Sequence, residues 1–353
     1  MNYKQYLNEF KKINNTLNKI PKSNALFRIL ISDLLVLYVL TEGILINRKF
    51  KGNIFAKPFI ILKSLSLKIS NYKKMSSNFS SSKFYHKKIT DFDKFHKDYF
   101  QTLWPNYTKK EFINDRLKPY IKRVKINKLS PLIKGKKCID FGCGHGQFLM
   151  ALKTLGAKSC LGIDIGKNSI KYANKMSKKL KFDTKNLKFI YSNATNLKVR
   201  SETYDFAIQN GVFHHIIDNN SEMKAYKEVY RVLKKDGYFL LHTAGEGSKS
   251  LRGITIEMTA RILSRFSTSE FSNYILNYPL SNNKKYMIRD NFIVKYKNTT
   301  WKKYIKFLKK MGFKYIRPLR GHSPTDFDKH FSKDKQFHSK FGEGHLRLLC
   351  QKI

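Results

Sequence analysis

The chain has 353 residues, 41% of them hydrophobic, and a formal net charge of +45 from 70 Lys and Arg against 25 Asp and Glu. This length predicts one large or two smaller domains, with enough apolar residues for a core. The basic excess is spread over the whole chain. This disfavours a nucleic-acid binder with one concentrated patch, and leaves open a solvated lysine-rich surface or a preference for anionic partners.

The four cysteines, Cys138, Cys143, Cys160 and Cys350, form no C-x-x-C pair. Their number and spacing disfavour a disulfide framework and a structural zinc site, and they suit a reducing compartment. The polar stretch 1–24 has no apolar core followed by a cleavage site, so no secretory signal peptide is expected there. We therefore predict a cytoplasmic location, with a peripheral membrane association left open.

The most apolar stretch of the chain covers residues 25–46, which is long enough to span a bilayer. Arg28, Asp33 and Glu42 interrupt it, and a charged residue costs about 2.5–3.5 kcal/mol at the centre of a membrane helix. The interruptions favour a buried or dimer-forming helix over a transmembrane one.

Residues 54–69 are also apolar, but lysines are spaced between the apolar residues, a composition typical of a basic interfacial helix. The composition of segment 25–69 therefore predicts either contact with an anionic membrane surface or packing onto the main domain. The serine-rich stretch 76–82 is the best linker candidate. It divides the chain into a helical N-terminal extension, 1–82, and a second domain, 83–353.

Alternating strand and helix patterns fill residues 131–244, which form the predicted catalytic core. Such alternation predicts an α/β fold with a parallel, doubly wound sheet and helices on both faces. Before this core, aromatic residues recur at helical spacing over 90–128, with a break at Pro105. The predicted strands are 137–141, 160–164, 187–191, 204–209 and 237–243, and the predicted helices 146–155, 168–181 and 221–234.

A glycine-rich turn follows the first predicted strand. The strand ends at Asp140, and Gly142, Gly144 and Gly146 alternate with other residues before an apolar helical run. Glycines at every second position allow a sharp turn and let a ligand lie directly against the backbone. The dinucleotide fingerprint requires a glycine where Gln147 stands, and the phosphate-binding P-loop motif is absent, so both of those ligand classes are disfavoured.

The pattern D-x-G-x-G-x-G resembles motif I of the class I S-adenosylmethionine (SAM) methyltransferases. Further segments in the family's order strengthen the resemblance. Asp164 ends the next strand, Asn193-Ala194 stands where the family usually has Asp-Ala, and Asp236-Gly237 forms a helix–turn–strand connection. The resemblance covers 120–244 well and 300–353 more loosely, and it is nearest to the branch that methylates quinones and small molecules. It implies a seven-stranded Rossmann-like sheet with SAM as the cofactor.

The resemblance also assigns roles to individual residues. The three glycines would admit the methionine part of SAM, and Asp140 would fix its amino group. Asp164 would hold the ribose hydroxyls, and Ile165 would pack on the adenine. The amide oxygen of Asn193, with Ala194, would read the adenine edge, and Gln209 or Asn210 would offer a backbone carbonyl to the amino group.

His214 and His215 follow the fourth strand, where the methyl acceptor should lie. A histidine titrates near neutrality and can act as a general base. Two adjacent histidines cannot both point into one site from a regular element, so packing or helix capping is the alternative for them.

Residues 245–299 do not continue the alternating pattern, and in the resembling enzymes an insertion here forms a substrate lid. Helical runs at 253–267 and 269–277 precede a polar turn at 281–283. The segment is basic and aromatic, which predicts either an anion-binding lid or a solvated cap. Residues 300–353 are expected to form an amphipathic helix and a closing strand pair. The loop 318–344 holds several His and Asp, but at no metal-binding spacing.

Three functions remain open from the sequence. The first is SAM-dependent methyl transfer to a small or lipid-like acceptor, by in-line displacement. The second is methylation of RNA or protein, which the charge favours, although the tetrapeptide and Pro-Cys motifs of common base-methylating enzymes are absent. The third is a SAM-binding assembly protein without turnover. Fold resemblance alone cannot choose among them.

Overall fold

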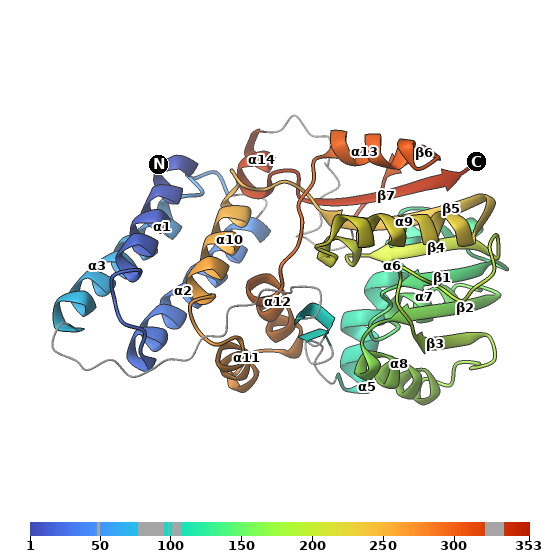
Figure 1. Cartoon of the computed structure of the whole chain (residues 1–353), viewed down its shortest axis with the longest axis horizontal. Coiled ribbons are helices and arrows are strands. Elements are labelled where there is room, and N and C mark those ends of the chain that lie inside the picture. The colour runs from blue at the N-terminus through green and yellow to red at the C-terminus, as the bar shows by residue number, and fades with distance from the viewer. Residues whose placement is uncertain (48–49, 77–94, 98, 101–106, 322–334) are drawn as a thin grey trace. The chain divides into compact units, whose positions relative to one another are not determined.

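The computed structural model describes residues 1–47, 50–76, 95–97, 99–100, 107–321 and 335–353 (Figure 1). The chain forms two compact units, each assembled from separate stretches of sequence. The first combines Met1–Ile89, Glu246–Val294 and Ser332–Gly342. The second combines Thr90–Gly245, Lys295–Phe331 and Glu343–Ile353. We describe each unit by itself.

A seven-stranded sheet forms the centre of the second unit, with strand order β3-β2-β1-β4-β5-β7-β6. The first five strands pair in parallel, and β7 pairs antiparallel with both β5 and β6. This arrangement confirms the predicted Rossmann-like sheet and its closing antiparallel pair. The strands are β1 (Lys137–Phe141), β2 (Ser159–Asp164), β3 (Leu187–Tyr191), β4 (Tyr204–Asn210), β5 (Leu233–Ala244), β6 (Phe313–Pro318) and β7 (His345–Lys352).

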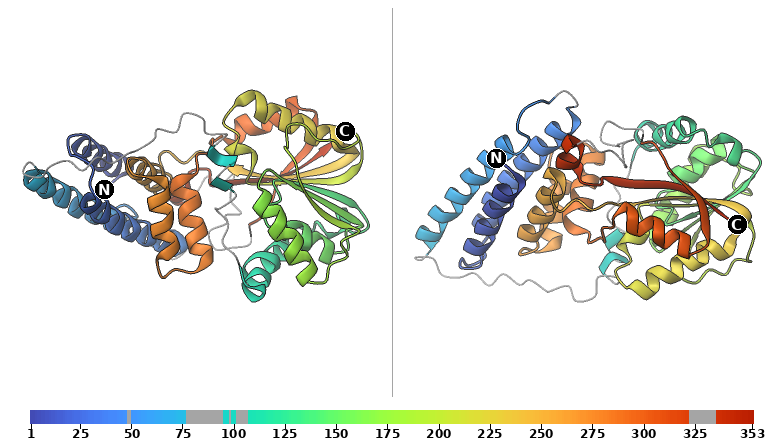
Figure 2. Two further views of the ribbon diagram at one scale, coloured as in Figure 1. Left: turned by 60° about the horizontal axis from the view of Figure 1, so that its bottom comes forward. Right: turned by 90° about the horizontal axis from the view of Figure 1, so that it is seen from above.

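Helices cover both faces of this sheet, as Figures 1 and 2 show. One face packs on α6, α7 and α8 around Phe148, Leu149 and Ile208. The other packs on α9 and α13 around Phe213, Tyr226 and Leu308. The helices of this unit are α5 (Lys109–Glu111), which continues through a π-helical turn (Phe112–Leu117) into α6 (Lys118–Ile126), then α7 (Gln147–Thr154), α8 (Lys167–Lys179), α9 (Asn219–Val232) and α13 (Trp301–Lys310).

The strand order fixes where a ligand can bind. The chain continues outward from β1 through β2 and β3, and then returns to place β4 on the other side of β1. The loops that follow β1 and β4 therefore lie beside the reversal of strand order, at the carboxyl ends of the strands, which is the usual ligand site of such folds. The glycine turn and the histidine pair lie on these two loops.

The first unit is helical. Its core is shared by helices from the N-terminal region and helices from the insertion after β5. Tyr6 of α1 donates or accepts a 2.9 Å hydrogen bond with Thr255 of α10, although 249 residues separate them in sequence. Its helices are α1 (Tyr3–Leu17), α2 (Asn24–Ile46), α3 (Ala56–Ser76), α10 (Leu251–Leu263), α11 (Thr268–Asn277), α12 (Asn282–Ile293) and α14 (Lys335–Phe341).

The structure departs from the sequence prediction in this unit. The insertion was predicted to belong to the second domain, as an anion-binding lid or a solvated cap, but Glu246–Val294 forms one compact unit with the N-terminal helices. The predicted polar turn at 281–283 is wrong, because Ser281 caps α12 and Asn282 and Asn283 lie in its first turn. The proposed linker after Ser76, the break at Pro105, and His322, Asp326, Asp328 and His330 of the long loop lie outside the described residues.

In the described part of the chain, α2 is the one helix long and apolar enough to cross a bilayer, and half of its apolar window is buried inside the protein. Its two acidic residues interact with basic residues of the same unit. Asp33 forms an ion pair with Lys68 of α3 at 2.9 Å. Burial raises the pKa of Glu42 above its usual value, and Arg252 and Lys284 oppose that shift. These contacts support the interpretation of α2 as a core helix.

Candidate functional site

The glycine turn after β1 requires its glycines. Gly142, Gly144 and Gly146 have φ angles of 76°, 53° and 77°, in the left-handed region that other residues rarely adopt. A Cβ on Gly142 would lie 2.5 Å from the side chain of Val212, in the loop after β4. A Cβ on Gly146 would lie 2.5 Å from the ring of Phe189 on β3. A side chain at either position would therefore clash with the neighbouring loop or strand, so the packing of the turn requires glycine there.

Asp164 at the end of β2 holds this turn in place. Its Oδ2 accepts a 2.8 Å hydrogen bond from the backbone N–H of Gly144, and its Oδ1 accepts a 2.7 Å bond from Gly166 N–H. Burial raises the pKa of this carboxyl group, and the two backbone bonds oppose the shift. The contact of Asp164 with the ribose stays a prediction, and this structural role was not predicted from the sequence. A carboxylate has about four lone-pair sites, so the two backbone bonds leave acceptor capacity for a ligand hydroxyl.

Asp140 lies at the end of β1 and is 2% exposed. Within the described part of the chain, its Oδ1 is buried and has no hydrogen-bond partner. Burial, together with the nearby Asp164 carboxylate, raises the pKa of Asp140 to about 8. A buried carboxyl oxygen without a partner is costly, and a cationic donor beside it would relieve the cost. The residues present therefore fit the ammonium group of a SAM molecule.

The residues predicted to contact the adenine follow β2 and β3. Ile165 is half-buried, Ala194 packs at the edge of the core, and Asn193 is exposed. The Oδ1 of Asn193 accepts hydrogen bonds from the backbone N–H and the hydroxyl of Thr195, both at 3.0 Å. This oxygen is therefore already engaged in a local turn, and its role toward adenine stays a prediction.

Gln209 and Asn210 end β4, and their side chains organise the surrounding loops. Gln209 is fully buried, and its Oε1 accepts from the backbone N–H groups of Val212 and Phe213 at 3.0 and 3.3 Å. Asn210 Oδ1 accepts a 2.9 Å bond from Arg123 of α6. Arg123 is a residue that the sequence analysis missed, because in the sequence it is one basic residue among many in a surface-type helix.

The histidine pair occupies the loop after β4. His214 is buried, and its Nδ1 lies 3.3 Å from the hydroxyl of Thr243. Burial, with His345 and His96 nearby, lowers the pKa of His214 to about 3, which makes it a weak base. His215 Nδ1 lies 3.1 Å from the backbone oxygen of Lys295, to which it can only donate. This leaves Nε2 as the basic nitrogen of His215, although burial lowers its pKa as well.

Aromatic rings surround the pair. Nε2 of His96 accepts a 3.1 Å hydrogen bond from the backbone N–H of Lys295. The ring proton of His96 is therefore on Nδ1, which donates to the backbone oxygen of His215 at 3.0 Å. Phe100 and Tyr296 approach His215 edge-on, with centroid distances of 5.2 and 6.1 Å. Phe100 belongs to the aromatic pattern noted over 90–128, but nothing in the sequence singled out His96. The sequence analysis also missed Tyr296, which lies in a stretch without periodicity.

No metal centre is evident in the described ranges, because these hold no group of three or more His, Cys, Asp or Glu side chains arranged to bind a metal ion. The His and Asp residues of the loop 322–334 are outside those ranges. His338, which is described, contacts the backbone oxygen of Gly342 through Nδ1 at 3.0 Å.

Comparison with known proteins matches this site to a family. Residues 132–308 match the family model described as a methyltransferase domain. A tRNA (carboxymethyluridine(34)-5-O)-methyltransferase of Arabidopsis thaliana is 32% identical over 115 residues, which are 32% of this chain and 25% of that protein. A mitochondrial ubiquinone biosynthesis O-methyltransferase of Dictyostelium discoideum is 40% identical over 60 residues, 17% of this chain and 19% of that protein.

The chain thus spans a quarter or less of the length of these two curated relatives. Among solved structures, the PH0226 protein of Pyrococcus horikoshii OT3 aligns with a TM-score of 0.42 and 17% identity, covering 70% of this chain and all of that one. The family match covers half of the present chain, and its bounds enclose the glycine turn, Asp164 and the histidine pair. The chain therefore belongs to the methyltransferase-domain family, the class I SAM-dependent methyltransferases that its motifs predicted.

Proposed function

We propose that this protein is an active SAM-dependent methyltransferase whose acceptor is a small or lipid-like molecule. The observation that carries the cofactor assignment is the unpartnered, buried oxygen of Asp140 beside a glycine turn whose Gly142 and Gly146 have no room for a Cβ. SAM supplies an electrophilic methyl group on a sulfonium sulfur. The protein's task is then to hold the acceptor in line and to remove a proton where the acceptor is an O–H or N–H group.

The acceptor side of the proposal rests on the rings around the histidine pair. Phe100, Tyr296 and His96 enclose His215, and a cluster of this kind suits a flat or apolar acceptor. His215 is the base we favour, because the fixed donor role of Nδ1 leaves Nε2 to accept the proton. His214, whose Nδ1 contacts the hydroxyl of Thr243, would position its neighbour.

A second candidate is methylation of RNA. The Arabidopsis relative is named for a tRNA substrate, and the net charge of +45 favours polyanions. The third candidate, a SAM-binding protein without turnover, would keep the glycine turn and Asp164 but transfer no methyl group. A cytoplasmic location remains part of the proposal.

The acceptor proposal is tested by incubating the protein with methyl-labelled SAM and two acceptor pools, demethylated quinols with lipid extracts and total tRNA. We expect label in the organic phase, and we expect His215→Gln to lower kcat by about 10²-fold or more, as loss of a general base does. The exposed Lys302→Gln on α13 serves as control. Label in tRNA alone would overturn the acceptor assignment, and no transfer to either pool by a SAM-binding protein would favour the third candidate.

A further inference from the structure

The outward face of α3 carries an unusual set of exposed apolar side chains. Ile60, Leu67 and Met75 are 68%, 63% and 62% exposed, and they are among the most exposed large apolar residues in the described ranges. They are spaced by seven and eight residues, so they lie on one side of the helix. Ser64 and Asn71, which lie between them on the same side, are exposed and uncharged. The result is an uncharged strip, with three exposed apolar side chains, along three turns and more of helix.

Lysines border this strip on both sides. At 100° per residue, Lys57 and Lys68 lie along one edge of the strip and Lys63 and Lys74 along the other. All four are exposed. Such long side chains can lay their methylenes along an apolar surface while the ammonium groups reach outward. An apolar strip with lysines on both edges is the pattern of a helix that lies in the interface of a membrane.

The strip continues onto α2. Val36 and Val39 are 51% and 50% exposed on the outer side of that helix. Asp33, one turn before Val36, forms an ion pair with Lys68, which follows Leu67 directly. This pair joins the two helices beside both apolar strips. The exposed strips of α2 and α3 therefore face the same side of the helix pair.

The charge of this region identifies the partner. Residues 1–76 contain fourteen Lys and Arg but only three acids. Two of those acids are engaged with the helices themselves: Glu9 pairs with Lys63 at 3.0 Å, and Asp33 pairs with Lys68. The third, Glu42, has its pKa raised by burial. The surface that remains is strongly positive.

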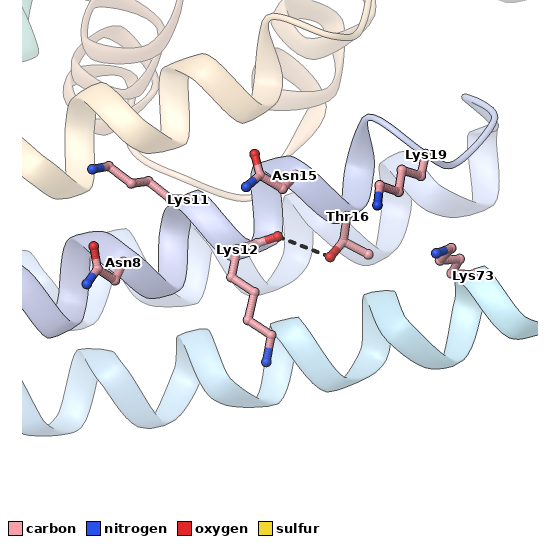
Figure 3. Close-up of a pocket in the computed structure, with 7 residues that line it drawn as sticks. All are labelled: Asn8, Lys11, Lys12, Asn15, Thr16, Lys19 and Lys73. Atoms are coloured by element: carbon pink, nitrogen blue, oxygen red, sulfur yellow. Dashed lines mark hydrogen bonds between the residues drawn. The ribbon is translucent and has the colours of Figure 1, made fainter.

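A groove of about 370 Å³ between α1 and α3 is also basic (Figure 3). Four lysines line it, together with three uncharged polar residues. These are Lys11, Lys12, Lys19, Lys73, Asn8, Asn15 and Thr16.

We propose that the outer face of α3, with the adjoining strip of α2, binds the surface of an anionic lipid bilayer. The apolar side chains enter the headgroup region and the flanking lysines contact lipid phosphates. A second copy of the chain is a poorer occupant, because pairing this face with itself would oppose lysine with lysine. A spanning α2 is also disfavoured, because its opposite side is packed in the core of the unit through Leu30, Leu34 and Leu37. The proposal does not depend on the methyl acceptor.

The test is sedimentation of the full chain with sucrose-loaded vesicles of neutral phosphatidylcholine, with or without 30% phosphatidylglycerol (about a third anionic lipid). We expect binding to the anionic vesicles that weakens with salt. Ile60→Ser/Leu67→Ser should reduce the partition coefficient at least about tenfold, because two apolar anchors are lost. Leu276→Ser/Tyr278→Ser, which removes two part-exposed apolar residues from α11 and its cap in the same unit, should stay within about twofold of the wild type.

Two double variants that remove lysine charges test the electrostatic contribution to vesicle binding separately. Lys57→Gln/Lys74→Gln should reduce binding to anionic vesicles by about tenfold, while Lys302→Gln/Lys309→Gln on α13 should have less effect. Equal binding to neutral vesicles would overturn the proposal. So would no binding by the wild type, or a wild-type dimer that Ile60→Ser/Leu67→Ser converts to monomer. SAM binding measured on the same samples keeps a failure here distinct from a failure of the proposed function.

Discussion

At the scale of single residues, Asp140 is the most informative position. Its carboxyl group is buried beside Asp164, and its pKa is raised to about 8. In the cofactor-free protein the neutral form is therefore favoured below pH 8, whereas in the unfolded chain the group ionises near its ordinary value of about 3.9. The folded state holds the extra proton, so this group's contribution to stability is present at low pH and is lost as the pH rises toward 8.

Binding of an ammonium group reverses this preference, because the cation requires the carboxylate. We predict that SAM binding at pH 7 releases a proton and that the affinity rises between pH 6 and pH 8. Calorimetry in buffers with different ionisation enthalpies measures both effects. Asp140→Asn should bind more weakly and abolish the proton release.

The matched control for Asp140 is Asp183→Asn. Asp183 is exposed, and hydrogen bonds from Asn186 and Lys185 lower its pKa, so it stays ionised over the same pH range. Proton release that persists in Asp140→Asn, or disappears in Asp183→Asn, would contradict the role assigned to Asp140.

Backbone motifs decided which site residues could be predicted from the sequence. Asp140, Gly142 and Asp164 occupy positions that any strand-turn-helix with this chemistry must fill, so they were identified without a structure. His96, Arg123 and Tyr296 come from segments without a motif, and only tertiary packing brings them to the end of β4. Their chemistry is ordinary in sequence, which is why they were missed.

At the scale of elements, the turn between β1 and α7 is held by sterics on both sides. Gly146 has φ 77°, and a Cβ there would meet the ring of Phe189 on β3 at 2.5 Å. Gly135 has a similar φ of 73°, but a Cβ there would meet nothing within 4 Å. Alanine substitutions at the two glycines therefore distinguish the free-energy cost of the backbone conformation from the cost of the steric clash.

We predict that Gly135→Ala lowers the free energy of unfolding by about 1–2 kcal/mol, the cost of a left-handed residue with a Cβ. Gly146→Ala should lose a further ~1–3 kcal/mol, because the added methyl group overpacks the core. Urea denaturation measures both, and SAM titration should show weaker binding only for Gly146→Ala. Equal destabilisation by the two variants would contradict the packing account.

The elements of the sheet were predictable because their patterns are local. Buried strands such as β1 and β4 are short apolar runs with polar residues at or near their ends. The turn predicted at Asp236 and Gly237 is wrong in its place, because β5 begins at Leu233 and contains Asp236, whose φ is 62°. The helix α12 was not predictable in the same way. Its first residues, Asn282 and Asn283, have weak helix propensity, and the capping hydroxyl of Ser281 and tertiary packing around Ile288 and Phe292 stabilise it instead.

At the scale of the whole molecule, the first unit is built from stretches that lie far apart in the sequence. Helix α10 buries Leu251, Ile254 and Ile262 in a core that also contains Leu30 and Leu34 of α2. The sequence could not reveal this, because the apolar faces of α2 and α10 are equally consistent with packing on a sheet, on a membrane or on each other. Only contacts between residues far apart in the sequence distinguish these cases. The hydrogen bond between Tyr6 and Thr255, which are 249 residues apart, is one such contact.

This arrangement predicts the effect of removing the N-terminal helices. A chain lacking residues 1–76 should expose the apolar face of α10, bind the dye ANS and aggregate, because a large exposed apolar patch is unstable in water. Size-exclusion chromatography and dye fluorescence measure this outcome. A monodisperse truncated protein that does not bind the dye would show that the insertion folds without its N-terminal partner.

The central claim is that the turn after β1 and the carboxylates of Asp140 and Asp164 bind SAM. Isothermal calorimetry of the full chain with SAM and with S-adenosylhomocysteine tests it most directly, with Asp164→Ala and the control Asp183→Ala measured alongside. We predict binding in the micromolar range for the wild type and for Asp183→Ala, weakened at least about tenfold by Asp164→Ala, which loses the ribose acceptor and the anchor of Gly144. A folded wild type that binds neither compound would contradict the account.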